Sequence, residues 1–140
     1  MAYRLTITQK PSYIHIVITG RNSKNTAMRY LKDVLHVCRI RKCRKLLIEE
    51  RLKGPRLKEF PIYEIVKNRS EDARGQFDAI AYVDVNAKGD LMKFAETVAV
   101  NRGIPVTVFS TVAEAECWLE DIAKNEKQAS LRNSHKEPTD

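Results

Sequence analysis

Short apolar runs that alternate with stretches of helical spacing constrain the fold of this chain more than any other feature. The runs cover residues 46–48, 77–85 and 104–109, and between them apolar residues recur every three or four positions. A strand, a helix and a further strand in succession form a parallel crossover, which places helices over the faces of the sheet. The pattern therefore predicts an α/β domain with a mostly parallel central sheet.

Two further strands are predicted at the start of the chain. Residues 3–8 and 13–19 are rich in β-branched and aromatic side chains, and a Lys-Pro-Ser segment separates them. They are expected to form an antiparallel hairpin whose first strand is an edge of the sheet. The predicted order of elements is ββαβαβαβα, with helices at about residues 26–41, 60–68, 90–102 and 112–123.

The chain has the size of one domain, since it contains 140 residues of which 43% are hydrophobic. The predicted domain spans residues 3–123, and residues 124–140 are predicted to form a disordered tail because Ala129 and Leu131 are their only apolar members. No run approaches the ~20 apolar residues of a membrane span, and the start of the chain lacks the apolar stretch of a secretory signal. These features predict a cytoplasmic protein.

The net charge of +7 raises the question of an acidic partner. Five of the seven residues at 39–45 are basic, but no aromatic residue interleaves with them to stack on bases. An acidic partner protein is therefore preferred over nucleic acid, and the plain alternative is that these cations complement the negative end of the first helix. The three cysteines form no Cys-x-x-Cys pair, so reduced thiols are expected.

Several short motifs in the second half of the chain accompany this order of elements. They are residues 81–86 (AYVDVN), 89–90 (GD), 94–96 (FAE), 102–106 (RGIPV), 111–115 (TVAEA) and 118–119 (WL). Together with the order of elements, they resemble bacterial proteins of the STAS superfamily, over roughly residues 3–123. Within it the chain is similar to the SpoIIAA-like proteins, which are anti-sigma-factor-antagonist-like and also described as STAS/SEC14-like. The resemblance implies a mixed sheet that starts with an antiparallel hairpin and is flanked by helices.

The resemblance also implies a regulatory role, but the phosphorylation site that usually controls such proteins is absent from the expected position. Anti-sigma antagonists of this fold carry a phosphorylatable Ser or Thr in an Asp-Ser-x-Gly-like motif just after the central strand. The corresponding residues here, 49–56 (EERLKGPR), contain no hydroxyl group, and the nearest alternatives, Ser110 and Thr111, follow a different strand. The first functional hypothesis is therefore a non-catalytic regulatory or protein-interaction domain.

A candidate ligand site lies at the carboxyl ends of the parallel strands, where ligands of open sheets bind. Glu49, Glu50 and Lys88 belong to these strand ends, and the candidate binding residues are Arg51, Lys53, Gly54, Arg56, Asp84, Asn86, Ser110 and Thr111. Basic side chains and the N–H groups near the glycine could hold a small anion. The alternative is a solvated loop in which the two glutamates pair with the basic side chains.

The carboxylates at these strand ends suggest two other types of site. Glu49, Glu50 and Asp84 could bind Mg²⁺, but strand alternation sends the two glutamates to opposite faces, so no metal or other cofactor is predicted. An enzyme would need one of these carboxylates to titrate abnormally in a cleft, and no nucleophile and base occur at a recognisable spacing. The chain is therefore not predicted to be an enzyme.

A second functional hypothesis is a carrier for a small apolar or anionic molecule. The ligand would lie beneath the loop of residues 51–60 and the short helix that follows it. A homodimer through the edge strand at residues 3–8 is a further expectation, because the backbone groups of an edge strand are free to pair with another chain.

Overall fold

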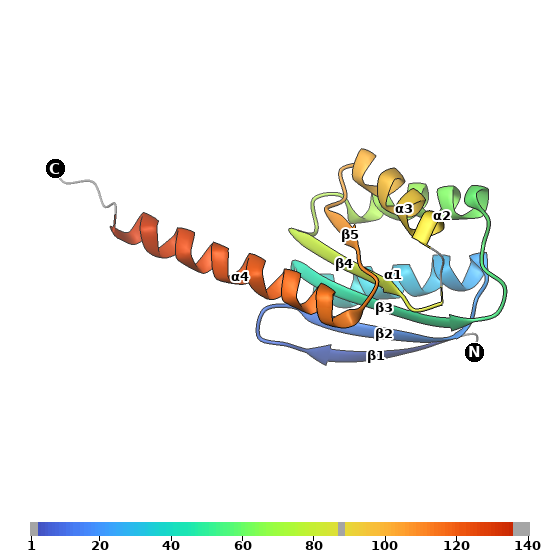
Figure 1. Cartoon of the computed structure of the whole chain (residues 1–140), viewed down its shortest axis with the longest axis horizontal. Coiled ribbons are helices and arrows are strands. Elements are labelled where there is room, and N and C mark those ends of the chain that lie inside the picture. The colour runs from blue at the N-terminus through green and yellow to red at the C-terminus, as the bar shows by residue number, and fades with distance from the viewer. Residues whose placement is uncertain (1–2, 87–88, 136–140) are drawn as a thin grey trace.

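The computed structural model describes residues 3–86 and 89–135, with side chains through residue 132. Five strands form one sheet in the order β1-β2-β3-β4-β5 (Figure 1). The first two are antiparallel and the others run parallel to β2: β1 (Tyr3–Gln9), β2 (Ile14–Arg21), β3 (Lys45–Lys53), β4 (Ala79–Asp84) and β5 (Val106–Val108). The prediction of an α/β fold with a mostly parallel sheet and an antiparallel hairpin at its start is confirmed.

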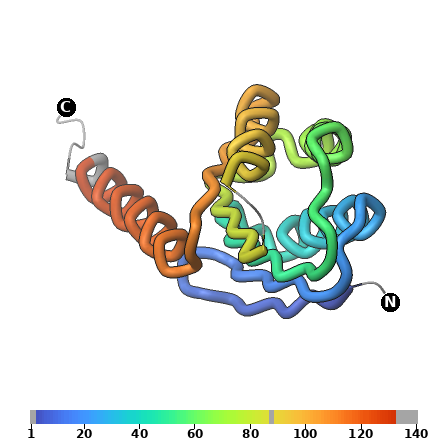
Figure 2. Tube along the Cα trace, turned by 45° about the vertical axis from the view of Figure 1, so that its right-hand side comes forward, coloured from blue at the N-terminus to red at the C-terminus, as the bar shows by residue number. Residues whose placement is uncertain are grey.

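Four helices cover the two faces of the sheet unequally. They are α1 (Lys24–Ile40), α2 (Glu59–Ala73), α3 (Gly89–Asn101) and α4 (Val112–His135). Figure 2 shows α4 on the opposite side of the strands from the other three helices. In the part of the chain that the structure describes, no helix is long and apolar enough to cross a membrane.

The α1 helix begins two residues earlier than predicted because Ser23 caps it. The Oγ atom of this serine accepts a hydrogen bond from the backbone N–H of Thr26 at 3.0 Å, which satisfies one of the free donors at the helix start. Within α1, Met28 and Leu31 are only partly buried, while Tyr30 is fully buried. The tyrosine therefore faces the sheet.

The central strand β3 is longer than predicted. The sequence indicated a brief strand and a loop from Arg51 onward, whereas β3 continues to Lys53 because β2 continues beside it as far as Arg21. Glu49 and Glu50 consequently lie inside a strand with neighbours on both sides, and they are only 6% and 5% exposed. The adjacent helix α2 also ends later than the predicted residues 68–70.

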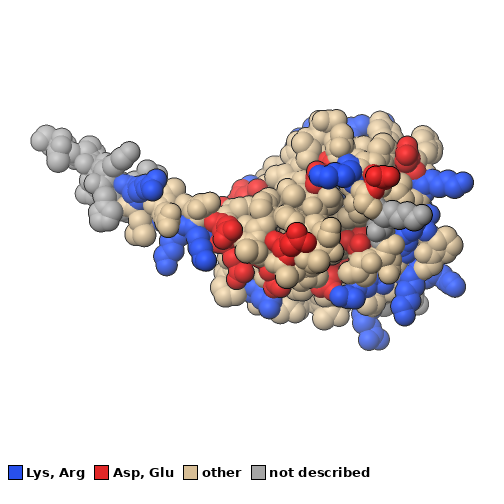
Figure 3. Space-filling model, viewed as in Figure 1, with Lys and Arg blue, Asp and Glu red and all other residues tan. Residues whose placement is uncertain are grey.

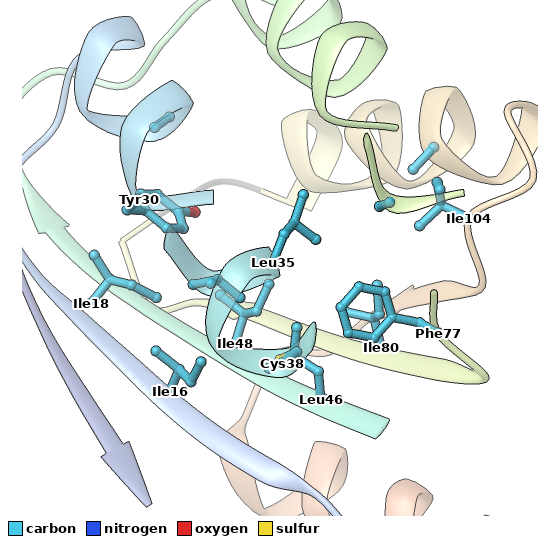
Figure 4. Packing of buried hydrophobic residues seen from close by; sticks show 14 of the residues in the cluster. Ile16, Ile18, Tyr30, Leu35, Cys38, Leu46, Ile48, Phe77, Ile80 and Ile104 are labelled. Carbon is cyan, nitrogen blue, oxygen red and sulfur yellow. The ribbon is translucent and has the colours of Figure 1, made fainter. Parts of the chain in front are cut away.

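Strand alternation divides the apolar residues into two cores, because successive side chains point to opposite faces of a sheet. The larger core lies under α1, α2 and α3, and Figure 4 shows its side chains between these helices and the sheet. Leu46, Ile48 and Leu52 of β3 belong to it, and Glu50 shares their face. The smaller core lies under α4 and contains Tyr13, Leu47, Ala79, Ala81, Val83, Ala115 and Leu119.

The predicted disordered tail differs from the structure, since α4 continues through His135 and extends beyond the sheet (Figures 1 and 2). The prediction considered only the scarcity of apolar residues. Residues 124–132 contain no glycine or proline and are mostly good helix formers, which allows a helix to continue without burial. Lys45 Nζ also lies 2.7 Å from Glu126 Oε2, which ties the helix to the start of β3. Residues 136–140 of the predicted tail lie outside the described residues.

Candidate functional site

An apolar cavity of about 180 Å³ lies between the sheet and the helices α1, α2 and α3. Most of its wall consists of aliphatic side chains, among them Val34, Leu35, Ile62, Ile65, Ile80 and Ile104. The polar side chains that converge on it include Tyr30, Glu50, Tyr82 and Asp84. An apolar cavity with a few converging polar groups is typical of a small-molecule site.

Three of these polar side chains form a buried hydrogen-bonded cluster, called here the Glu50 cluster. The hydroxyls of Tyr30 and Tyr82 both donate to Oε2 of Glu50, and the two hydroxyl oxygens lie 3.1 Å apart. The three residues come from α1, β4 and β3. Because β3 and β4 are parallel and in register, Glu50 also lies directly beside Asp84. The fold thus gathers two tyrosines and two carboxyl groups at one part of the cavity.

The surroundings of Glu50 strongly disfavour its ionised form. Burial raises the pKa of its carboxyl group, the neighbouring Asp84 carboxylate raises it further, and the two tyrosine hydroxyls act in the opposite direction. The resulting pKa is about 7. Burial also raises the pKa of both Tyr30 and Tyr82 well above the usual value, so the tyrosines remain hydrogen-bond donors.

Three of the predicted site residues, Arg56, Asp84 and Asn86, lie together next to the Glu50 cluster. Nη1 of Arg56 is 3.3 Å from Oδ2 of Asp84, and Nη2 donates to the carbonyl of Leu52 at 2.6 Å. The side-chain amide of Asn86 donates to the same carbonyl at 3.0 Å, and its backbone N–H donates to Oδ1 of Asp84 at 2.9 Å. The arginine therefore binds groups of the protein itself and clamps the loop after β3 onto the end of β4.

Arg56 and Asp84 line the cavity, whereas Asn86 and the remaining predicted residues do not. Lys53 and Gly54 are exposed at the end of β3, where the φ of +109° at Gly54 makes a turn that favours glycine. Ser110 is exposed after β5, and the Thr111 hydroxyl accepts from the backbone N–H of Glu114 at 3.2 Å, which caps the start of α4. Another residue of the predicted strand ends, Lys88, lies outside the described residues.

A second set of polar side chains interacts on the opposite face of β3. Nε of Arg51 donates to Glu49, and His15 Nε2 lies 2.8 Å from Oε1 of the same carboxylate. Although burial by itself would raise the pKa of Glu49, these hydrogen bonds hold it below its usual value. The predicted pairing with a nearby arginine is thus confirmed for Glu49. It is wrong for Glu50, which forms no ion pair within residues 3–86 and 89–135.

The magnesium alternative depended on Glu49, Glu50 and Asp84 facing one site. The two glutamates lie on opposite faces of β3, as strand alternation predicted. Across the described residues no group of three His, Cys, Asp or Glu side chains could hold a metal ion. Of these three carboxylates, Glu50 and Asp84 line the cavity and Glu49 does not.

Sequence reasoning considered a ligand beneath the residue 51–60 loop and the helix after it, but it missed Tyr30 and Tyr82. Two signals could have indicated the tyrosines. Tyr30, Val34 and Cys38 recur at helical spacing, so they share one face of the helix. Tyr82 follows Ile80 by two positions in the strand, so these two side chains point to the same face of the sheet. The cavity has no such signal, because its shape depends on how three helices pack on the sheet.

Basic residues gather at two places on the surface. Figure 3 shows them at the end of the molecule where β3 leads into α2, and on the part of α4 that extends beyond the sheet. In the basic cluster at residues 39–45, Arg44 pairs with Asp78 at 3.1 Å and Lys45 pairs with Glu126. Part of that cluster is therefore neutralised within the molecule.

The candidate site thus combines an apolar cavity with the Glu50 cluster, next to the Arg56–Asp84 ion pair. No protein-family model matches the chain, and a search of curated proteins finds no relative.

Proposed function

We propose that the protein is a non-catalytic domain that binds a small apolar molecule in the cavity beneath α1, α2 and α3. The observation that carries the proposal is the volume and the apolar wall of this cavity. An engineered cavity of about 150 Å³ with a similar aliphatic lining binds benzene, so a space of this size accepts a molecule with one ring or a short branched chain. Its position beneath the residue 51–60 loop and α2 agrees with the carrier hypothesis drawn from the sequence.

The proposed domain belongs to the STAS-like class and has a regulatory role. The mixed sheet that starts with an antiparallel hairpin agrees with that class. A shallow recess adjoins the cavity, and Phe60 in its wall is 69% exposed. Leu57 and Leu91 line both spaces, so a ligand in the cavity would contact the same side chains as a protein bound at the recess. The proposed role is ligand-dependent contact with a partner protein.

Binding of toluene tests the cavity directly. We expect the wild-type protein to bind toluene with a dissociation constant on the order of 0.1–1 mM, because one buried ring supplies only a few kcal/mol. Saturating toluene should also raise the melting temperature, since it binds only the folded state. Isothermal titration calorimetry and thermal unfolding measure the two effects.

A variant that fills the cavity separates this binding from adsorption to the surface. Ala95 of α3 lines the cavity, so Ala95→Leu is expected to weaken toluene binding by at least about tenfold. Ala113→Leu, on the exposed side of α4, is the matched control and should bind as the wild type does. Equal binding by the wild type and Ala95→Leu would place the toluene elsewhere and contradict the proposal.

A second candidate function is acid–base catalysis, which one observation favours. A carboxyl group with a pKa of about 7 in an apolar cavity can both give and take a proton near neutral pH, and Glu50 has these properties. This candidate predicts that the wild type, but not Glu50→Gln, consumes some small molecule of a cell extract, as followed by mass spectrometry. Identical extracts after the two incubations would count against catalysis.

A further inference from the structure

The charges in the cavity wall suggest the chemical class of the ligand. Two arginines line the cavity, and each forms an ion pair with a carboxylate: Arg56 with Asp84 at 3.3 Å, and Nη1 of Arg69 with Asp72 at 2.7 Å. Among the described residues, the buried Nε of Arg69 has no hydrogen-bond partner. Glu50 also lines the cavity, and within the described part of the chain no cation pairs with it. Among these charged side chains, Glu50 is therefore the one whose charge has no counter-ion.

The contacts of Glu50 favour a positively charged partner. Its Oε2 atom accepts from Tyr30 and Tyr82, and the side chain beside it in the register is another carboxylate, Asp84. Neutral hydroxyl donors stabilise an ionised carboxylate only in part, and burying an unpaired charge is costly. A proton or a cation from outside the protein would remove that cost.

We infer that the ligand is an apolar amine whose ammonium group pairs with the Glu50 carboxylate while its hydrocarbon part fills the cavity. The inference rests on the proposed binding function and adds the charge of the ligand to it. Where Glu50 is protonated, binding of the ammonium form releases that proton to the solvent; where Glu50 is already ionised, the ammonium group supplies its counter-ion. The aliphatic wall lowers the local dielectric constant around this pair, which strengthens the attraction between the two charges.

Three single-ring probes of similar size but different charge test the inference: benzylamine, toluene and benzoate. At about pH 7.5 we expect the wild type to bind benzylamine roughly tenfold or more tightly than toluene, because a hydrogen bond between charged groups is stronger than a neutral contact. Benzoate should not bind measurably, since its charge repels Glu50. Isothermal titration calorimetry gives all three dissociation constants.

Two variants at neighbouring positions show which carboxylate is responsible. Glu50→Gln keeps the shape of the side chain but removes its charge, so it should lose the preference for benzylamine over toluene. Glu49→Gln is the matched control, because Glu49 is equally buried on the opposite face of β3 and does not line the cavity. This control should keep the preference.

The pH dependence of the wild type gives a test that needs no variant. Benzylamine remains a cation across the range, so lowering the pH to about 5 should weaken its binding by adding a proton to Glu50, whereas toluene binding should not change. Toluene binding without any preference for benzylamine overturns this inference and leaves the proposed function intact. Tighter binding of benzoate also overturns it, and a protein that binds none of the probes contradicts both proposals.

Discussion

Raising the pH from about 4.5 to about 8 is expected to lower the free energy of unfolding by about 3 kcal/mol through Glu50 alone. The pKa of this carboxyl group rises from 4.5 in the unfolded chain to about 7 in the folded protein. The folded state therefore holds the proton more tightly than the unfolded chain does. Its stabilising contribution is complete below pH 4.5 and is lost as the pH rises through 7. Urea unfolding at a series of pH values measures this loss.

Two variants isolate the contribution of Glu50 to this profile. Glu50→Gln has no proton to lose, so its stability should change much less over the same pH range. Glu49→Gln should keep the wild-type slope there, since the pKa of Glu49 is lowered and its contribution is lost only when the pH falls below about 4.5. Parallel profiles for the wild type and Glu50→Gln would show that folding does not raise the pKa of Glu50.

Truncation of Leu119 in α4 is expected to destabilise the protein by about 3 kcal/mol. This leucine is fully buried in the smaller core, where it packs with Leu47 and Val83 of the sheet. Since α4 covers that core, Leu119→Ala would leave a void that few neighbouring side chains can fill. The midpoint of urea unfolding, followed by far-UV circular dichroism, gives the change in free energy.

The same helix provides the control for this truncation. Leu131 lies on the part of α4 that extends beyond the sheet, and it is 52% exposed. Leu131→Ala should therefore change the free energy of unfolding by less than about 0.5 kcal/mol. Equal losses in the two variants would mean that the distal part of α4 is also packed against something in solution.

The type and order of the helices and strands could be predicted because they depend on local patterns. Strand alternation also placed Glu49 and Glu50 on opposite faces of β3, since that consequence holds for any strand. The capping interaction between Thr111 and Glu114 was recognisable for the same reason, because both residues belong to one turn of helix. Each of these features involves residues close together in the chain.

The lengths of the elements were less predictable because they depend on neighbours or on helix propensity. The β3 strand continues past Glu50 because β2 extends beside it as far as Arg21, and a run of three apolar residues gives no sign of this. Helix α4 continues past Lys124 without an apolar face to bury. A prediction that relied on apolar residues alone ended both elements too early.

The sequence by itself determined the α/β class, the hairpin at the start of the chain and the face on which each strand residue lies. Only the tertiary structure decided that Tyr30, Glu50 and Tyr82 meet at one cavity and that Arg56 is held by Asp84. The physical reason is that periodicity reports which side of an element is apolar, whereas a binding site depends on how separate elements pack. The rotation of α1 and the register of β3 against β4 set these contacts, and neither is encoded in a short segment of the chain.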